Sequence, residues 1–148
     1  MELKSLLVDS KTTWVEFPGL SGFEVELANL SRKELTNLRK KCTINKFNRK
    51  TRQFEDELND EKFVVEFTRS TVKNWKGLKL EYLQDLLLVD LKDQDSKKEL
   101  EFSEENAQVL VENSTEFDNW LNEVVFDLDN FRTSDEGKTK GKTSPVSG

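Results

Sequence analysis

Two stretches of the chain contain residue types that could hold a phosphate or a metal ion, but neither completes its motif. Gly137–Thr143 reads GKTKGKT and is one residue short of the G-x-x-x-x-G-K-[ST] phosphate loop; no strand is expected before it and no helix after it. Asp93, Asp95 and Glu104 stand at positions 1, 3 and 12 of a calcium loop, yet Lys97 stands where an oxygen ligand is required. We therefore interpret both stretches as solvated loops and expect no metal ion and no cofactor.

The residue types give little support to catalysis. The chain has no histidine, which excludes histidine-based triads and histidine metal sites. Neighbouring acids such as Glu104–Glu105 belong to no recognisable pocket that would separate their pKa values. The single cysteine, Cys42, excludes an internal disulfide, and it shares a helical face with Leu35 and Leu38, which favours a core thiol over a reactive one. We expect no catalytic residue and no enzymatic activity.

Charge is distributed unevenly along the chain. Residues 32–54 contain nine Lys and Arg against one acid, whereas residues 55–136 contain 23 acids against nine basic residues. The basic segment 39–52, RKKCTINKFNRKTR, has a single aromatic residue, which is a poor stacking platform for bases. A solvated segment and a site for an acidic protein both remain open, and nucleic acid is the weakest alternative. The candidate contacts at its start are Arg39, Lys40 and Lys41.

Length and composition indicate a globular domain with a tail. Ten Phe and three Trp among 148 residues compensate for an apolar content of 34%. No apolar run approaches the roughly 20 residues that cross a bilayer, and no secretory signal opens the chain, so we expect no membrane partner. After residue 132 the composition is rich in Gly, Lys, Ser and Thr, which is typical of disorder. We expect one domain over residues 1–132 and a flexible tail over 133–148.

The N-terminal part of the chain predicts a β-hairpin. Trp14–Leu27, WVEFPGLSGFEVEL, shows two alternating apolar runs around a loop of Pro, Gly and Ser, and alternation with period two is typical of strands. The expected hairpin covers residues 13–28. A hairpin alone is barely stable in water, so its apolar face requires a covering layer. Residues 3–8 fit a helix and a strand equally well.

The rest of the domain predicts a helical body over residues 31–132. Ser31 and Glu34 form a capping box, and Asn59 or Asp60, Ser103 and Thr115 are the other expected caps. Residues 43–57 lose periodicity and are interpreted as a mobile connection. The expected helices cover residues 32–42, 60–75, 80–88, 104–113 and 116–131.

Aromatic residues concentrate on two of these helices. Residues 60–75 and 116–131 each show a helical apolar stripe, and we expect both helices to pack on the hairpin. Part of the stripes could remain available to a partner. The fold class predicted is α+β, an antiparallel hairpin packed on four or five helices. The candidate partner-binding aromatic residues are Phe63, Phe67, Trp75, Phe117 and Trp120.

Several motifs in this order resemble the tail assembly chaperones of long-tailed bacteriophages. The resemblance covers about residues 12–132 and rests on fold-forming residues, none of which is chemically active. The motifs are WVEFPGLSGFEVEL (14–27), NLSRKEL (29–35), NWKGL (74–78), FSEEN (102–106) and STEFDNW (114–120).

The resemblance implies a non-enzymatic late protein made in the bacterial host cytoplasm and absent from the mature virion. Members of the family bind the tape measure protein and help recruit tail tube subunits around it. Many also exist in a longer form made by ribosomal frameshifting, and self-association is a further expectation. Two alternatives remain: a minor structural tail or head-completion protein, and a nucleic-acid-binding regulator that uses segment 39–52.

Overall fold

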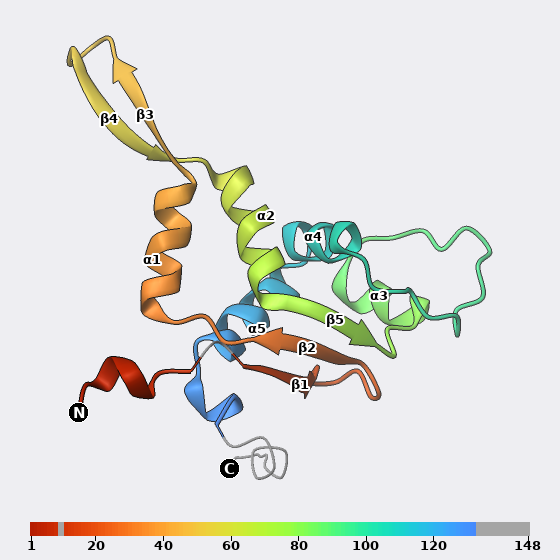
Figure 1. Ribbon diagram of the computed structural model, residues 1–148. Helices are drawn as coiled ribbons and strands as arrows, with labels where there is room; N and C mark the ends of the chain where they lie inside the picture. Colours follow the sequence, from red (N-terminus) through yellow and green to blue (C-terminus); the bar gives the residue numbers. More distant parts are fainter. Residues whose placement is uncertain (9–10, 133–148) are drawn as a thin grey trace.

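The computed structural model describes residues 1–8 and 11–132, which form an α+β fold, as expected (Figure 1). Its main sheet is antiparallel with the order β1–β2–β5. The first two strands, β1 (Thr12–Glu16) and β2 (Glu24–Ala28), confirm the hairpin predicted over residues 13–28. The predicted tail over 133–148, which includes the phosphate-loop-like stretch, lies outside the described residues.

The third strand of the sheet corrects a predicted helix. Helix α2 (Asp60–Thr71) is followed at once by β5 (Val72–Lys76), so the helix expected over 60–75 ends four residues earlier. Strand β5 pairs with the free edge of β2, where Val25 lies opposite Trp75. This edge supplies backbone partners that the local apolar pattern does not reveal, and tertiary pairing therefore overrides the helical periodicity.

Five α-helices occur among the described residues. Helix α1 (Arg32–Lys41) begins at Ser31, whose side chain and that of Glu34 make both bonds of the expected capping box. Ser103 caps α4 as predicted, and of the two candidates expected for α2, Asn59 or Asp60, Asn59 is the cap. The last helix begins one residue earlier than expected and is capped by Ser114, not Thr115. The remaining helices are α3 (Leu80–Leu86), α4 (Glu104–Asn113) and α5 (Thr115–Val125).

Both ends of the described chain contain short 3₁₀ turns. The helix expected over 116–131 ends at Val125, because Asp127 accepts a bond from the amide of Asp129 and begins the separate turn η2 (Leu128–Asn130). Residues 3–8, for which helix and strand were both left open, contain a 3₁₀ turn, η1 (Leu3–Leu6), and none of its residues is buried.

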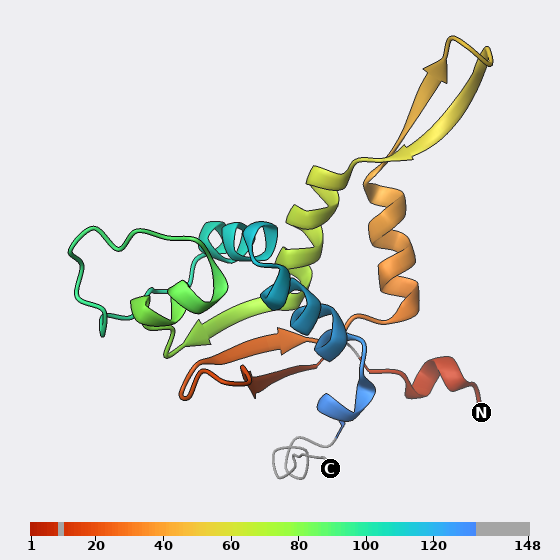
Figure 2. The same cartoon turned by 180° about the vertical axis from the view of Figure 1, so that it is seen from behind.

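The core lies between one face of the sheet and the helices that pack against it, of which α5 lies in front of the sheet in Figure 2. Phe23, Val25 and Leu27 from the hairpin are fully buried, together with Phe117 and Leu121 of α5. The aromatic rings of the core pack stacked, tilted or edge to face: the centroid of Phe23 lies 6.4 Å from that of Phe117 in a stacked pair and 6.4 Å from that of Trp75 in an edge-to-face pair. The expectation that the last helix covers the hairpin is therefore correct.

The segment expected to be a mobile connection, 43–57, is a second β-hairpin. Strands β3 (Thr43–Asn48) and β4 (Gln53–Leu58) pair in antiparallel register and form a separate two-stranded sheet. Asn48 organises its turn by accepting bonds from the amides of Lys50 and Thr51. Alternation of apolar and polar residues with period two arises when one face of a strand is buried. Neither face of this hairpin is buried, so the alternation is weak here and does not reveal the strands.

Candidate protein-binding arm

The hairpin of β3 and β4, residues 43–58, projects away from the body as an arm (Figures 1 and 2). It stands on the last turn of α1 and the first turn of α2, and its base is closed by the amide of Asn59, which donates to the carbonyl of Cys42 at 2.8 Å. Nearly every residue of both strands is exposed. The arm is therefore held by its base and its own cross-strand contacts.

Two phenylalanine rings lie side by side on the arm. Phe47 and Phe54 are directly opposite each other in the register, with centroids 5.2 Å apart in an edge-to-face arrangement. Their exposed fractions are 52% and 69%, and neither ring belongs to the core or to the residues packed against it. Such a cross-strand pair contributes about 0.5–1.5 kcal/mol beyond area burial. The pair stabilises the arm and also leaves a large apolar surface in water.

Side chains of β3 neutralise or bind the acids of β4. Lys46 forms an ion pair with Glu57 at 2.9 Å, and the amide of Asn45 donates to Asp56 at 3.1 Å. In the same way the side-chain amide of Asn48 donates to the carboxylate of Glu55 at 3.0 Å. The acids of the arm thus already have partners.

The turn at the tip of the arm is basic. Arg49, Lys50 and Arg52 are exposed, and within the described part of the chain their side chains make no ion pair and no hydrogen bond. Arg52 has a φ of 60°, in the left-handed region, and its amide donates to the carbonyl of Asn48 at 2.7 Å. The tip therefore presents three cations beside two aromatic rings.

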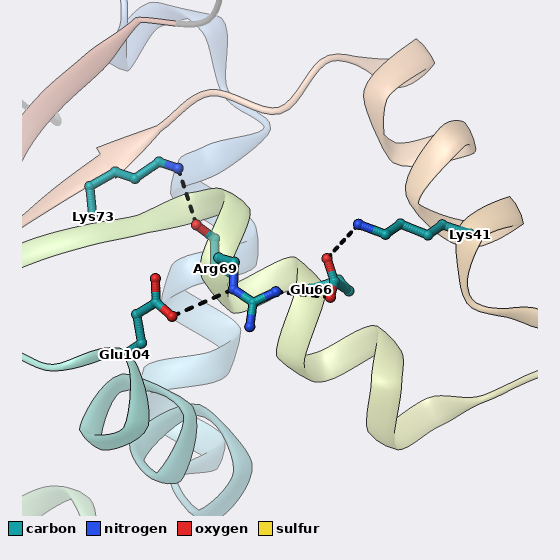
Figure 3. Close-up of polar contacts among 5 residues, drawn as sticks. All are labelled: Lys41, Glu66, Arg69, Lys73 and Glu104. Atoms are coloured by element: carbon teal, nitrogen blue, oxygen red, sulfur yellow. Dashed lines mark hydrogen bonds and ion pairs between the residues drawn. The ribbon is translucent and has the colours of Figure 1, made fainter.

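A network of ion pairs connects helices α1, α2 and α4 beneath the arm (Figure 3). We call these three helices the platform. Glu66 of α2 binds Lys41 of α1 at 2.9 Å and Arg69 at 3.0 Å, and Arg69 reaches Glu104 of α4 at 3.5 Å. The hydrogen bond from Lys41, assisted by the charge of Arg69, holds the pKa of Glu66 below its ordinary value. The network ties α1, α2 and α4 together and so orients the base of the arm.

An open groove of about 480 Å³, lined by both polar and apolar residues, lies beside this platform, between α1 and the end of the sheet. Its apolar wall is Ala28, Leu30 and Leu38, and Lys41 and Lys73 are among its charged residues. Over residues 1–8 and 11–132 no group of three or more potential metal ligands gathers in one place, so the calcium-loop acids do not form a cluster there.

The predicted site residues divide into two groups. Phe67, Trp75 and Phe117 are buried in the core, and the indole N–H of Trp75 donates to the carbonyl of Leu100 at 2.9 Å. The expectation that these rings leave surface for a partner is wrong, because the sheet and helices cover them. Phe63 and Trp120 are half-buried against the same core.

The basic residues predicted as contacts lie close to the arm. Arg39, Lys40 and Lys41 are exposed on the last turn of α1, although Lys41 is engaged by Glu66. Neither Phe47 nor Phe54 was among the predicted site residues. The signal that identifies them is that two phenylalanines directly flank the polar segment NRKTRQ (48–53).

Comparison of the chain with protein families, curated proteins and solved structures finds no match. Among the described residues, none of the helices combines the length and the apolar character that spanning a bilayer requires.

Proposed function

We propose that the protein is a non-enzymatic tail assembly chaperone of a long-tailed bacteriophage, which binds the tape measure protein and helps recruit tail tube subunits. The proposal places it in the host cytoplasm and outside the mature virion. The single observation that carries a protein-binding role is the arm, whose exposed Phe47 and Phe54 contribute nothing to the core. Large exposed apolar surfaces on a charged exterior are characteristic of protein interaction sites.

The physical requirements of such a chaperone agree with the arm and the body. A long client protein exposes apolar helical stripes before tube subunits surround it, and a chaperone needs apolar side chains that reach those stripes. The net charge of −6 and the 35% of charged residues favour solubility of the complex. Three of the motifs that resemble the family overlap elements of the fold: strand β2, strand β5 and the start of α5. This overlap agrees with the interpretation that the motifs consist of fold-forming residues.

Co-expression with the tape measure protein tests the proposal. We expect the wild-type chain to raise the soluble fraction of the tape measure protein and to be recovered with it in a pull-down. The double variant Phe47→Ser/Phe54→Ser should lose this effect. Leu88→Ser/Val109→Ser is the matched control, because it removes two exposed apolar side chains from other parts of the surface. If both variants solubilise the tape measure protein equally well, the arm does not take part in binding. If the wild-type chain is not recovered with the tape measure protein, the proposed function is wrong.

A structural role in the particle is the second candidate, and mass spectrometry of purified virions separates it from the first. The chaperone proposal requires absence from the particle. A stoichiometric amount of the protein in virions would instead assign it to the tail or head.

A further inference from the structure

The arm tip has a chemical complement on the opposite end of the same molecule. After α5 the chain exposes Phe126 and Leu128, with exposed fractions of 41% and 55%. The acids Glu123, Asp127 and Asp129 surround them in the sequence and are all exposed. We call residues 123–129 the acidic patch. It therefore presents apolar side chains among carboxylates, whereas the arm tip presents apolar side chains among cations.

The geometry points to a contact in which the arm tip of one copy of this chain docks on the acidic patch of a second copy. In both views the arm lies at one end of the molecule and the turn η2 at the other, so a chain cannot make this contact with itself (Figures 1 and 2). Phe47 and Phe54 meet Phe126 and Leu128 at its centre, where burial of these side chains adds to the attraction between the cations of the tip and the acids of the patch.

Charge selects this arrangement over two others. Contact between two arm tips would place Arg49 and Lys50 against the same cations of the other copy, which is repulsive. The N-terminal segment exposes Leu3 and Leu7, but Glu2 and Lys4 balance each other in charge, so it offers the cations of the arm no excess of carboxylates.

The pairing pattern at the two surfaces strengthens the argument. The arm-tip cations have no ion-pair partner among the described residues, and in the acidic patch only Asp129 is paired, with Arg132 at 2.9 Å. Nucleic acid fits the tip less well, because Phe47 and Phe54 meet edge to face and do not present parallel faces to successive bases.

The contact is heterologous, since two different surfaces of the chain meet. Such contacts produce rings or open chains instead of simple two-fold dimers. The inference does not depend on the proposed function, because purified protein alone can show it. If both hold, a client and a second copy compete for the same two rings, and client binding dissociates the self-assembly.

Sedimentation velocity of the purified full-length chain tests the contact. We expect the weight-average sedimentation coefficient to rise with protein concentration at about 50 mM salt and to fall toward the monomer value at about 0.5 M salt, where charges are strongly screened. A monomer at every concentration in low salt would overturn the inference.

Charge variants locate the interface. Arg49→Glu/Lys50→Glu should raise the apparent dissociation constant roughly tenfold or more, since attraction becomes repulsion. Arg32→Glu/Lys33→Glu makes the same change in net charge at the start of α1 and should leave association unchanged. Circular dichroism confirms that each variant is folded. A similar effect of both charge variants would show a net-charge effect and refute the assignment to the arm.

Mixing two defective variants gives the sharpest test. Glu123→Lys/Leu128→Ser removes the patch and keeps the arm, whereas Arg49→Glu/Lys50→Glu removes the arm and keeps the patch. Each variant should be monomeric alone, and their mixture should form 1:1 dimers that grow no further. Failure of the mixture to associate would overturn the heterologous contact. Association only on addition of a labelled single-stranded oligonucleotide, followed by fluorescence anisotropy, would assign the tip to nucleic acid instead.

Discussion

Gly77 holds two separated parts of the fold in backbone contact, and its replacement by alanine should be costly. The residue follows β5 with a φ of 76°, in the left-handed region. A Cβ placed there would lie 2.7 Å from the carbonyl carbon of Gly22 and closer still to its oxygen, in the loop of the first hairpin. No flexible side chain stands between them, so relief requires that one backbone segment moves.

Gly19 provides a matched control in the same loop. Its φ is 88°, and a Cβ there would have nothing within 4 Å. Gly19→Ala should therefore cost only the left-handed strain, about 1–2 kcal/mol. Gly77→Ala adds overpacking of about 1–3 kcal/mol to the same strain, giving about 2–5 kcal/mol in total. The larger value approaches the whole stability of a marginal domain, which is about 5–15 kcal/mol.

Urea unfolding followed by tryptophan fluorescence measures both variants against wild type. The midpoint should fall much further for Gly77→Ala than for Gly19→Ala, with little change in the dependence on urea concentration. Trp75, two residues before Gly77, provides a local reporter. Equal losses for the two variants would mean that the close approach to Gly22 is unimportant and that strain alone accounts for the effect.

Four further substitutions test side-chain interactions, each by the free energy of unfolding. The pKa of Glu66 is lowered in the folded state, so its contribution to the free energy of unfolding is present above the ordinary pKa of 4.5 and is lost as pH falls. Glu66→Gln should therefore be less stable than wild type at pH 7, and this difference in stability should close at lower pH. A pH-independent gap would contradict the role of the Lys41 ion pair. The hydroxyl of Thr68 is buried without a hydrogen-bond partner among the described residues, so Thr68→Val should be neutral or stabilising, whereas Thr71→Val, which removes a buried bond to a helix carbonyl, should cost about 0.5–1.5 kcal/mol. Ser114→Ala removes the cap of α5 and should cost about 0.5–2 kcal/mol; a loss near zero would refute the importance of the cap.

Tertiary pairing explains one wrong prediction of secondary structure, and a local turn explains another. The pattern around Trp75 continues a helical stripe, but the open edge of β2 converts residues 72–76 into a strand. The chain beyond Val125 likewise keeps apolar residues at helical spacing, while the cap at Asp127 begins a new turn. Local periodicity reports which residues become buried more reliably than it reports the backbone conformation that buries them.

The predicted binding residues show the same limit. A ring such as Phe117 has the same local signature whether it packs in a core or faces a partner, because both roles require an apolar stripe. Burial distinguishes the two, and burial is a property of the assembled fold. The arm was interpreted as a connection for the opposite reason: its strands have no buried face, so they lack the alternation that identifies strands.

The sequence by itself determined the first hairpin, the capping box at Ser31, the cap at Ser103 and the α+β class. These features depend on interactions between residues close in the chain, where side-chain type and spacing decide the outcome. Only the tertiary structure decided that β5 completes the sheet and that Phe47 and Phe54 remain exposed on a projecting arm. Both outcomes depend on which distant surfaces meet and which are left without a partner, and local composition carries no direct record of that.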